Sequence, residues 1–319
     1  MTTQENLNSI NKLSHDLREN IEKVVVSNNE ALDLAIVAIL CNGHILIEDV
    51  PGIGKTTLAK SLAQSLGCTF KRIQFTPDLT PTDVLGTNIY NQRSGDFDFR
   101  PGPIFTQLLL GDEINRATPR TQSALLEAMQ ERQITIEGST TPLPNPFIVL
   151  ATQNPIEMEG TFPLPEAQLD RFMLRISLGY PSELNEGLIV SRFQKDLNPD
   201  ELINPVIAVD DLLKVQKLVP EVMVAEPTSE YLIRIVRATR INPSLDLGAS
   251  PRATLFLYRA AQAFAAIHNR SYVLPDDIKF LALPVLGHRL LISPQSRLRG
   301  QTVDSIIQEV LDSVPVPVE

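Results

Sequence analysis

One segment near the N-terminus has the residue types that bind phosphate groups. An apolar run at residues 45–47 is followed by a glycine-containing loop and then by the pattern of a helix start. Glycines let such a loop turn its backbone N–H groups around a phosphate, and the positive end of the following helix adds to the attraction. We expect these residues to contact the phosphates of a nucleotide: Pro51, Gly52, Ile53, Gly54, Lys55, Thr56 and Thr57.

Lys55 and Thr56 have distinct predicted roles in this loop. The Lys55 ammonium group would neutralise the β- and γ-phosphates of ATP, and the Thr56 hydroxyl would bind Mg²⁺. The usual phosphate-loop motif has a first glycine at the position where this sequence has Asp49. A chance Gly-x-Gly-Lys turn is the alternative interpretation of the segment.

A second motif follows the apolar run at residues 108–110, which ends in Gly111-Asp112-Glu113. Parallel sheets bind their ligands at the carboxyl ends of the strands, so both acids are expected at that edge. Asp112 would hold Mg²⁺ through water, and Glu113 would polarise the attacking water as a general base. An Asp-Glu pair alone is common at helix starts, but its place after a predicted core strand makes it specific.

A third motif is the apolar run at residues 147–150, which continues into Ala-Thr-Gln and then Asn154 and Pro155. The strand therefore ends close to a neutral amide. The Asn154 side chain could orient the attacking water or contact the γ-phosphate. A plain Asn-Pro turn is the alternative interpretation.

Taken in this order, the three motifs resemble those of the AAA+ ATPases, and most closely those of the MoxR family, which lies near the magnesium-chelatase group. The resemblance covers the chain from about residue 24 to about residue 290, and four blocks carry it: 112–117, 151–155, 165–172 and 250–253. It implies an α/β fold in which an AAA+ parallel-sheet nucleotide-binding domain, with helices on both faces, precedes a smaller all-helical lid domain. It also implies ATP hydrolysis, with ATP and Mg²⁺ as cofactors.

The resemblance also implies roles for individual residues. Glu113 becomes the catalytic glutamate, Asn154 the sensor of the γ-phosphate, and Arg171 the arginine finger that reaches into the nucleotide site of a neighbouring subunit. Arg252 opens a predicted lid helix and matches the second sensor. A cation at a helix N-terminus already requires an anionic partner. Without the resemblance, Arg171 would be interpreted as a surface or ion-paired residue.

The adenine base is expected to contact Val25 and Val26. The family usually has Val-Gly-Gln at this point, whereas this chain has Val26-Ser27-Asn28. Ser27 is also a predicted N-cap, because Glu30 three residues later would complete a capping box for the next helix.

Alternating apolar runs must position these residues. From residue 45 to about residue 178, short apolar runs alternate with helical stretches, which is typical of a mostly parallel sheet covered on both faces. Strands are expected at residues 45–47, 70–75, 108–110, 147–150 and 173–178. Helices are expected at residues 1–22, where apolar residues have helical spacing, and at 182–193, 210–219, 228–238, 251–266 and 275–281.

We place a domain boundary near residue 180. Residues 1–180 would form the ATPase core, and residues 181–319 would form the helical lid. Two β-hairpins are predicted within the core, at 87–99 and 133–143. The resemblance makes the first the helix-2 insert and the second the pre-sensor-1 hairpin, both near a central pore; decorative loops are the alternative.

Composition limits the other possibilities. The 319 residues are 43% hydrophobic and carry a formal net charge of −10, which disfavours tight sequence-independent binding to nucleic acid. The longest strictly apolar run, 34–41, is far too short to cross a bilayer, and the polar start lacks a secretory signal, so no membrane insertion and a cytoplasmic location are expected. Two cysteines and four histidines are scattered, and no zinc site is expected.

The family resemblance implies a ring-forming machine, a homo-oligomer that is usually a hexamer, which uses ATP to remodel partner proteins. It further implies a partner with a von Willebrand factor A domain and a role in metal-cofactor insertion or complex maturation, but no residue identifies the client. A nucleic-acid motor, such as a clamp loader or branch-migration helicase, is the alternative function. A small-molecule kinase that uses the same phosphate loop is a third possibility.

Overall fold

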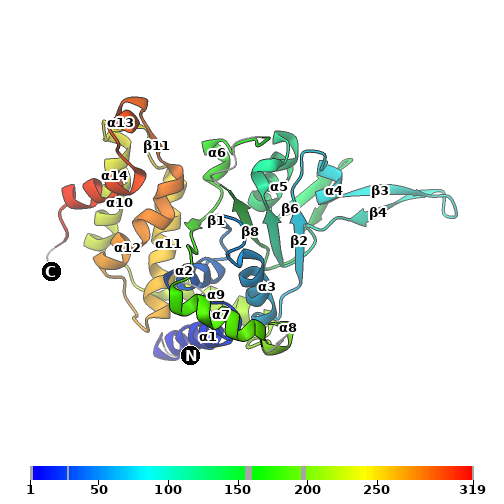
Figure 1. Cartoon of the computed structure of the whole chain (residues 1–319), viewed down its shortest axis with the longest axis horizontal. Helices are drawn as coiled ribbons and strands as arrows, with labels where there is room; N and C mark the ends of the chain where they lie inside the picture. The colour runs from blue at the N-terminus through cyan, green and yellow to red at the C-terminus, as the bar shows by residue number, and fades with distance from the viewer. Residues whose placement is uncertain (1–2, 27–28, 155–159, 195–198, 318–319) are drawn as a thin grey trace.

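A computed structural model describes residues 3–26, 29–154, 160–194 and 199–317 (Figure 1). The predicted N-cap at Ser27 lies outside the described residues. The helix that it would begin is α2 (Asn29–Leu40), which is almost entirely buried.

A five-stranded sheet forms the centre of the first half of the chain. Its order is β2-β5-β8-β1-β9, and every neighbouring pair is parallel. The expected parallel α/β architecture is therefore confirmed, and each strand lies within two or three residues of its predicted position. The strands are β1 (Ile45–Glu48), β2 (Phe70–Gln74), β5 (Leu108–Asp112), β8 (Ile148–Gln153) and β9 (Leu174–Ile176).

The apolar runs of the central strands are explained by burial on both faces. Side chains alternate along a strand, so Ile45 and Ile47 belong to one hydrophobic cluster and Leu46 to a second on the opposite face. The same alternation separates Leu108 and Leu110 from Leu109. Because both faces are covered, the polar residues that follow the strands can only gather at the sheet edge.

Different helices cover the two faces (Figure 1). The cluster that contains Ile45 also includes apolar side chains of α1 (Thr3–Glu22), α2 and α3 (Lys55–Ser65). The helical spacing predicted for α1 is confirmed, because its apolar positions are all buried: Leu7, Ile10, Leu13, Leu17 and Ile21. The other cluster includes residues of α4 (Pro81–Leu85), η1 (Ile114–Arg116) and α5 (Pro119–Glu131).

Both predicted hairpins are present. Strands β3 (Gly86–Asn91) and β4 (Asp96–Pro101) pair antiparallel and project away from the body of the molecule (Figure 1). Strands β6 (Gln133–Ile136) and β7 (Ser139–Pro142) form the second hairpin. Its turn lies at Glu137 and Gly138, both with positive φ. Their assignment as family inserts stays a prediction.

After β9 the described chain is mainly helical. The helices α10, α11, α12 and α14 pack as a bundle, and α11 also packs against α1 and α2. The short antiparallel pair of β10 (Leu245–Leu247) and β11 (Leu291–Ile292) adds a small amount of sheet to this region. The helices are α7 (Glu183–Gln194), α8 (Pro199–Leu202), α9 (Val209–Leu218), α10 (Glu226–Ile241), α11 (Pro251–Ile267), α12 (Pro275–Leu286), α13 (Pro294–Leu298) and α14 (Val303–Ser313), with 3₁₀ turns η2 (Val219–Glu221) and η3 (Gly287–Arg289).

This region differs from the sequence expectation in three respects. Helix α12 continues to Leu286 in spite of Pro284, and α14 was not anticipated. Helix α9 packs against α1 and α2 beside the core rather than joining the distal bundle (Figure 1). The division of the chain at residue 180 stays a prediction.

Within the described part of the chain, no helix combines the length and apolar character that a membrane span requires.

A buried histidine connects the sheet to α5. The Nδ1 of His44 accepts from the backbone N–H of Val149 at 3.0 Å, and its Nε2 lies 3.0 Å from the Met129 carbonyl oxygen. Nε2 therefore carries the proton and donates it to this carbonyl. Burial, reinforced by the charge of Arg132, lowers the pKa of His44 from 6.5 to about 3.

The His44 pKa predicts an acid-sensitive fold. The unfolded chain binds a proton at this residue below pH 6.5, but the folded chain excludes it until about pH 3. The free energy of unfolding should therefore fall as pH drops through this window, by up to about 1.4 kcal/mol per pH unit from this residue. Urea unfolding at several pH values measures the slope. His44→Gln, which keeps a donor and an acceptor, should have a shallower slope; an unchanged slope would contradict the assignment.

Candidate functional site

The predicted phosphate loop connects β1 to the first turn of α3. Gly52 and Gly54 have φ of 86° and 91°, in the left-handed region that glycine adopts without strain. A Cβ atom at either residue would contact nothing within 4 Å, so backbone conformation rather than space requires glycine here. The loop therefore has the local geometry that its sequence predicts.

A cleft of about 430 Å³ opens at the carboxyl ends of β1, β5 and β8. It brings together the phosphate loop and the residues predicted from the three separate motifs: Lys55, Thr56, Asp112, Glu113 and Asn154. The Nζ of Lys55 donates to the backbone carbonyl of Asp49 at 2.6 Å. Partial burial lowers the pKa of Lys55, while the nearby acids raise it, so a bound anion would favour its charged form.

Asp112 and Glu113 each contact two neighbouring polar side chains. Asp112 accepts a hydrogen bond from the Thr152 hydroxyl at 2.6 Å and forms an ion pair with Arg72, also at 2.6 Å. Glu113 accepts from the Gln74 amide at 2.9 Å and pairs with Arg116 at 3.0 Å. Glu113 also has a positive φ of 56°, which aims this side chain from the strand end into the cleft region.

None of these four neighbours was anticipated from the sequence: Arg72, Gln74, Arg116 and Thr152. The first two line the same cleft and alternate with buried Ile73 on β2. The signal was present in the sequence, because polar residues within a strand of an otherwise apolar parallel sheet need polar partners. Thr152 lies two residues before Asn154 in the third motif, which predicted no role for the threonine side chain.

The oxygen donors in the cleft fit a magnesium ion. Mg²⁺ prefers hard oxygen ligands and is usually held by one or two protein groups together with phosphates and waters. The Thr56 hydroxyl and the Asp112 carboxylate supply this donor set, and both line the cleft that contains Lys55.

A larger cavity of about 770 Å³ adjoins the phosphate cleft and shares four residues with it: Pro51, Gly52, Gly54 and Thr57. Val25 and Val26, the residues predicted to contact adenine, line this cavity. Its other walls come from the connection between β9 and α7 and from the first turns of α7, including Tyr180 and Ile189. Mostly apolar walls next to a phosphate loop suit a nucleoside.

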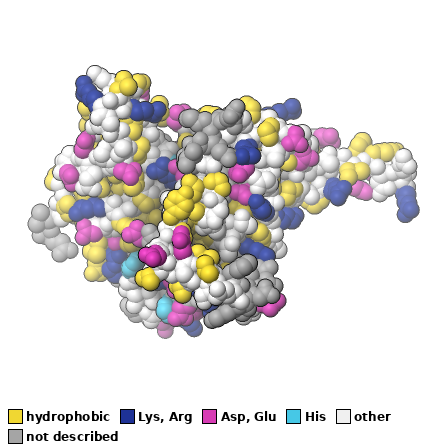
Figure 2. Space-filling model, in the orientation of Figure 1, with side chains coloured by type: hydrophobic (Ala, Val, Ile, Leu, Met, Phe, Trp, Pro, Cys, Tyr) yellow, Lys and Arg dark blue, Asp and Glu magenta, His cyan; other side chains and the backbone are white. Residues whose placement is uncertain are grey.

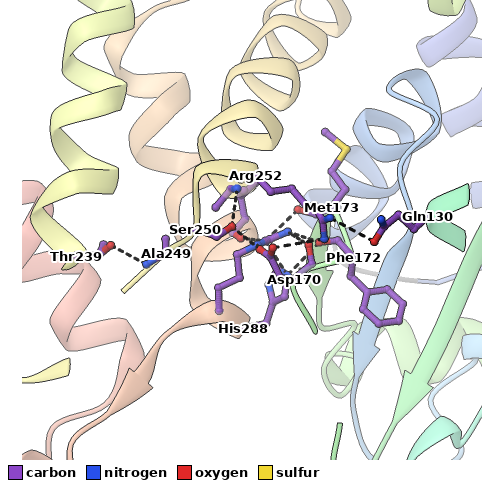
Figure 3. Close-up of polar contacts among 12 residues, drawn as sticks. Gln130, Asp170, Phe172, Met173, Thr239, Ala249, Ser250, Arg252 and His288 are labelled. Atoms are coloured by element: carbon purple, nitrogen blue, oxygen red, sulfur yellow. Dashed lines mark hydrogen bonds and ion pairs between the residues drawn. The ribbon is translucent and has the colours of Figure 1, made fainter. Parts of the chain in front are cut away.

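The two predicted arginines lie elsewhere. Arg171 and Arg252 line a third cavity of about 270 Å³, which shares no lining residue with the phosphate cleft. Arg252 lies 3.5 Å from the Asp170 carboxylate and 3.3 Å from the Gln130 amide oxygen (Figure 3). Asp170 is thus the anionic partner that a cation at this helix start requires. The structure does not bring Arg171 or Arg252 to the phosphate loop of their own chain.

Asp170 joins the core to the helical region. Its carboxylate accepts from the Ser250 hydroxyl at 2.8 Å, at the start of α11, and from the Arg289 Nε at 2.8 Å (Figure 3). Arg289 is only 3% exposed and also donates to the carbonyl oxygens of Phe172 and Met173. The two residues beside Asp170, Arg171 and Phe172, are therefore fixed relative to the lid. None of the sequence motifs predicted a role for Asp170, Ser250 or Arg289.

The Asp170 contacts predict a large stability effect. Asp170→Asn would leave the Arg289 guanidinium buried without its carboxylate, which costs about 3 kcal/mol or more. Urea unfolding measures the loss. Asp211→Asn is the matched control, because the Asp211–Lys214 ion pair is exposed and its loss should lower stability far less than the loss of the Asp170 contacts. Equal effects of the two substitutions would show that Asp170 does not join the two regions.

Comparison with known proteins gives consistent results along the chain. Residues 44–174 match the family described as "ATPase family associated with various cellular activities (AAA)", and residues 237–310 match the "AAA lid domain". The chain is 49% identical over 301 residues to the uncharacterized protein YeaC of Bacillus subtilis, covering 94% of each chain. It is 41% identical to Chaperone MoxR1 of Mycobacterium tuberculosis, covering 93% of this chain and 80% of the relative.

A solved structure supports the same relationship. The crystal structure of a candidate ATPase from Cytophaga hutchinsonii superposes with a TM-score of 0.91 at 40% sequence identity. The superposition covers 98% of each chain. The similarity therefore includes the helical region as well as the sheet.

Proposed function

The chain belongs to the MoxR-type AAA+ ATPases, and from this premise we propose that it forms a ring in which each nucleotide site is shared between two subunits. The ATPase activity and the chaperone-like character follow from the family. The ring, its expected hexameric state, the roles of individual residues and the cytoplasmic location belong to the proposal.

One observation carries the proposal. Lys55, Thr56, Asp112, Glu113 and Asn154 line one cleft, whereas Arg171 and Arg252 line a separate cavity of the same chain. Charge on a transferring phosphoryl group is stabilised by cations. The cleft of a single chain contains Lys55 and Arg72, which is ion-paired with Asp112, but neither Arg171 nor Arg252. A second copy whose arginine cavity faces this cleft would complete the site.

The geometry supports a division of work within the site. The nucleoside would lie in the larger cavity beside Val25 and Val26, and the phosphates would lie on the backbone N–H groups of the loop and on Lys55. Magnesium, held by Thr56 and Asp112, would supply charge neutralisation at the phosphates. Asn154 would orient the attacking water.

Glu113 would take the proton of the attacking water. Gln74 and Arg116 both contact Oε2 of this carboxylate. Since an ionised carboxylate accepts at both oxygens, Oε1 is the atom that would take the proton.

The remodelling function concerns proteins rather than nucleic acids. On the face shown in Figure 2, Lys and Arg side chains of the described residues are interspersed with Asp and Glu, and the whole chain has a net charge of −10. This favours the protein remodeller over the nucleic-acid motor. The partner with a von Willebrand factor A domain, and a role in metal-cofactor insertion or complex maturation, remain part of the proposal.

Substitutions in the cleft should separate binding from turnover. Lys55→Ala removes the charge next to the phosphates, so ATP binding should be lost; Glu113→Gln should bind ATP like wild type but release phosphate at least about 100-fold more slowly. Calorimetry and phosphate release measure the two properties. Lys12→Ala, at an exposed position on α1, is the control. If Lys55→Ala bound ATP as tightly as the wild type, this result would contradict the assignment of the phosphate loop.

Mixed subunits test the shared site. Arg171→Ala should bind ATP but hydrolyse it slower by a factor of about 10³ or more, because an arginine finger stabilises the transferring phosphoryl group. Mixing the Arg171→Ala protein with the Lys55→Ala protein should restore hydrolysis at interfaces that join an intact loop to an intact Arg171. The rate of ATP hydrolysis should be highest near equal amounts of the two variants. Arg252→Ala should behave like Arg171→Ala. Absence of recovery in mixtures that native mass spectrometry shows to be mixed oligomers would contradict the shared site.

A further inference from the structure

Asp49 stands where a phosphate loop usually has its first glycine, and nothing in the proposed chemistry uses its side chain. The residue is 8% exposed. It is not among the described residues with positive φ, so the backbone does not require glycine at this position. A buried carboxylate has to be compensated by hydrogen bonds or charges, and its partners indicate what it does.

Within the described part of the chain, three consecutive residues of one segment donate hydrogen bonds to this carboxylate. The Oδ1 accepts from the Ser177 hydroxyl at 2.8 Å and from the Gly179 N–H at 3.3 Å. The Oδ2 accepts from the Leu178 N–H at 2.5 Å. Residues 177–179 follow β9, where ladder pairing with β1 has ended, and lead into α7.

The same segment forms a wall of the larger cavity. Leu178, Gly179 and Tyr180 all line it, opposite the loop residues that line both cavities. Beyond the last ladder pair, the Leu178 N–H depends on Asp49 for a partner. Loss of that partner would leave a buried donor unsatisfied and free the segment to move.

The main chain of Asp49 contacts the other half of the site. Its carbonyl oxygen accepts from the Lys55 Nζ at 2.6 Å. One residue therefore contacts both the lysine expected to bind the phosphates and the wall expected to bind the nucleoside.

We propose that Asp49 is a positioning residue. It holds residues 177–180, the wall of the larger cavity that is expected to contact the nucleoside, in a fixed position relative to the phosphate loop. The inference rests on the proposed function, since it takes the larger cavity as the nucleoside site. Its consequence is selective: loss of the Asp49 carboxylate should weaken the binding of the nucleoside part of a ligand and leave the binding of its phosphates intact.

ADP and inorganic pyrophosphate separate these two contributions, because both present a diphosphate and only ADP carries a nucleoside. Asp49→Asn keeps the size of the side chain but replaces one acceptor oxygen by an N–H₂ donor that faces other donors. Calorimetry with Mg²⁺ present should show ADP affinity reduced about tenfold and pyrophosphate affinity changed by less than about twofold. Ser177→Ala removes one of the three donors. It should also lower the ratio of ADP affinity to pyrophosphate affinity, but by a smaller factor.

Glu48→Gln is the matched control. Glu48 is the last residue of β1, directly before Asp49, and it contacts β9 through Arg175 at 2.8 Å, but it lines neither cavity. Its substitution should leave the ratio of ADP to pyrophosphate affinity at the wild-type value. Circular dichroism of each variant shows whether the fold is retained.

The outcomes separate the inference from the proposed function. Equal loss of both ligands in Asp49→Asn, or loss of neither, would overturn the positioning role, because a general effect on the loop moves both affinities together. If Asp49→Asn does not fold, the ratio in Ser177→Ala decides: an unchanged ratio overturns the inference. If the wild-type protein binds ADP no more tightly than pyrophosphate, the cavity is not a nucleoside site and the proposed function fails with the inference.

Discussion

The carboxyl ends of β1, β5 and β8 meet at one edge of a sheet whose two faces are buried, and the rest of the site depends on this constraint. Apolar side chains fill both faces, so polar groups that follow the strands have no other place to gather. The phosphate loop, the acidic pair and Asn154 come from parts of the chain about 100 residues apart, yet they line one cleft. The helices cover the faces of the sheet and leave the edge at these strand ends accessible to a ligand.

A second constraint concerns the helical region. One continuous hydrophobic cluster includes α1, α2, α11 and α12, so the lid packs firmly against the core. The ion pair between buried Arg289 and half-buried Asp170 reinforces this contact next to Arg171. Arg171 and Arg252 are therefore held together at a cavity away from the loop of their own chain. A chain that holds Arg171 and Arg252 away from its own phosphate loop is suited to work with a second copy of itself.

Sequence reasoning predicted the sheet well because its strands are short apolar runs bounded by loop residues. It also predicted a glycine-containing loop between β1 and α3, whose binding of phosphate stays a prediction. It also predicted that Asp112, Glu113 and Asn154 would share an edge. It missed Arg72 and Gln74, because polar residues on a strand show no partner until the neighbouring strand is known. It could not place Arg171 and Arg252, since their position depends on how α11 packs across the core. Asp49 was noticed only as a departure from a motif, because its partners are about 130 residues away.

The central claim is that one chain carries two complementary halves of a nucleotide site and that a neighbouring copy completes it. An electron cryo-microscopy structure of the Glu113→Gln protein with ATP and Mg²⁺ tests this most directly. The account predicts an oligomer in which ATP occupies the cleft and the adjoining cavity of one subunit while Arg171 of the next subunit faces the γ-phosphate. ATP bound in that cleft with no neighbouring subunit beside it, or with Arg171 turned away from every nucleotide, would contradict the account.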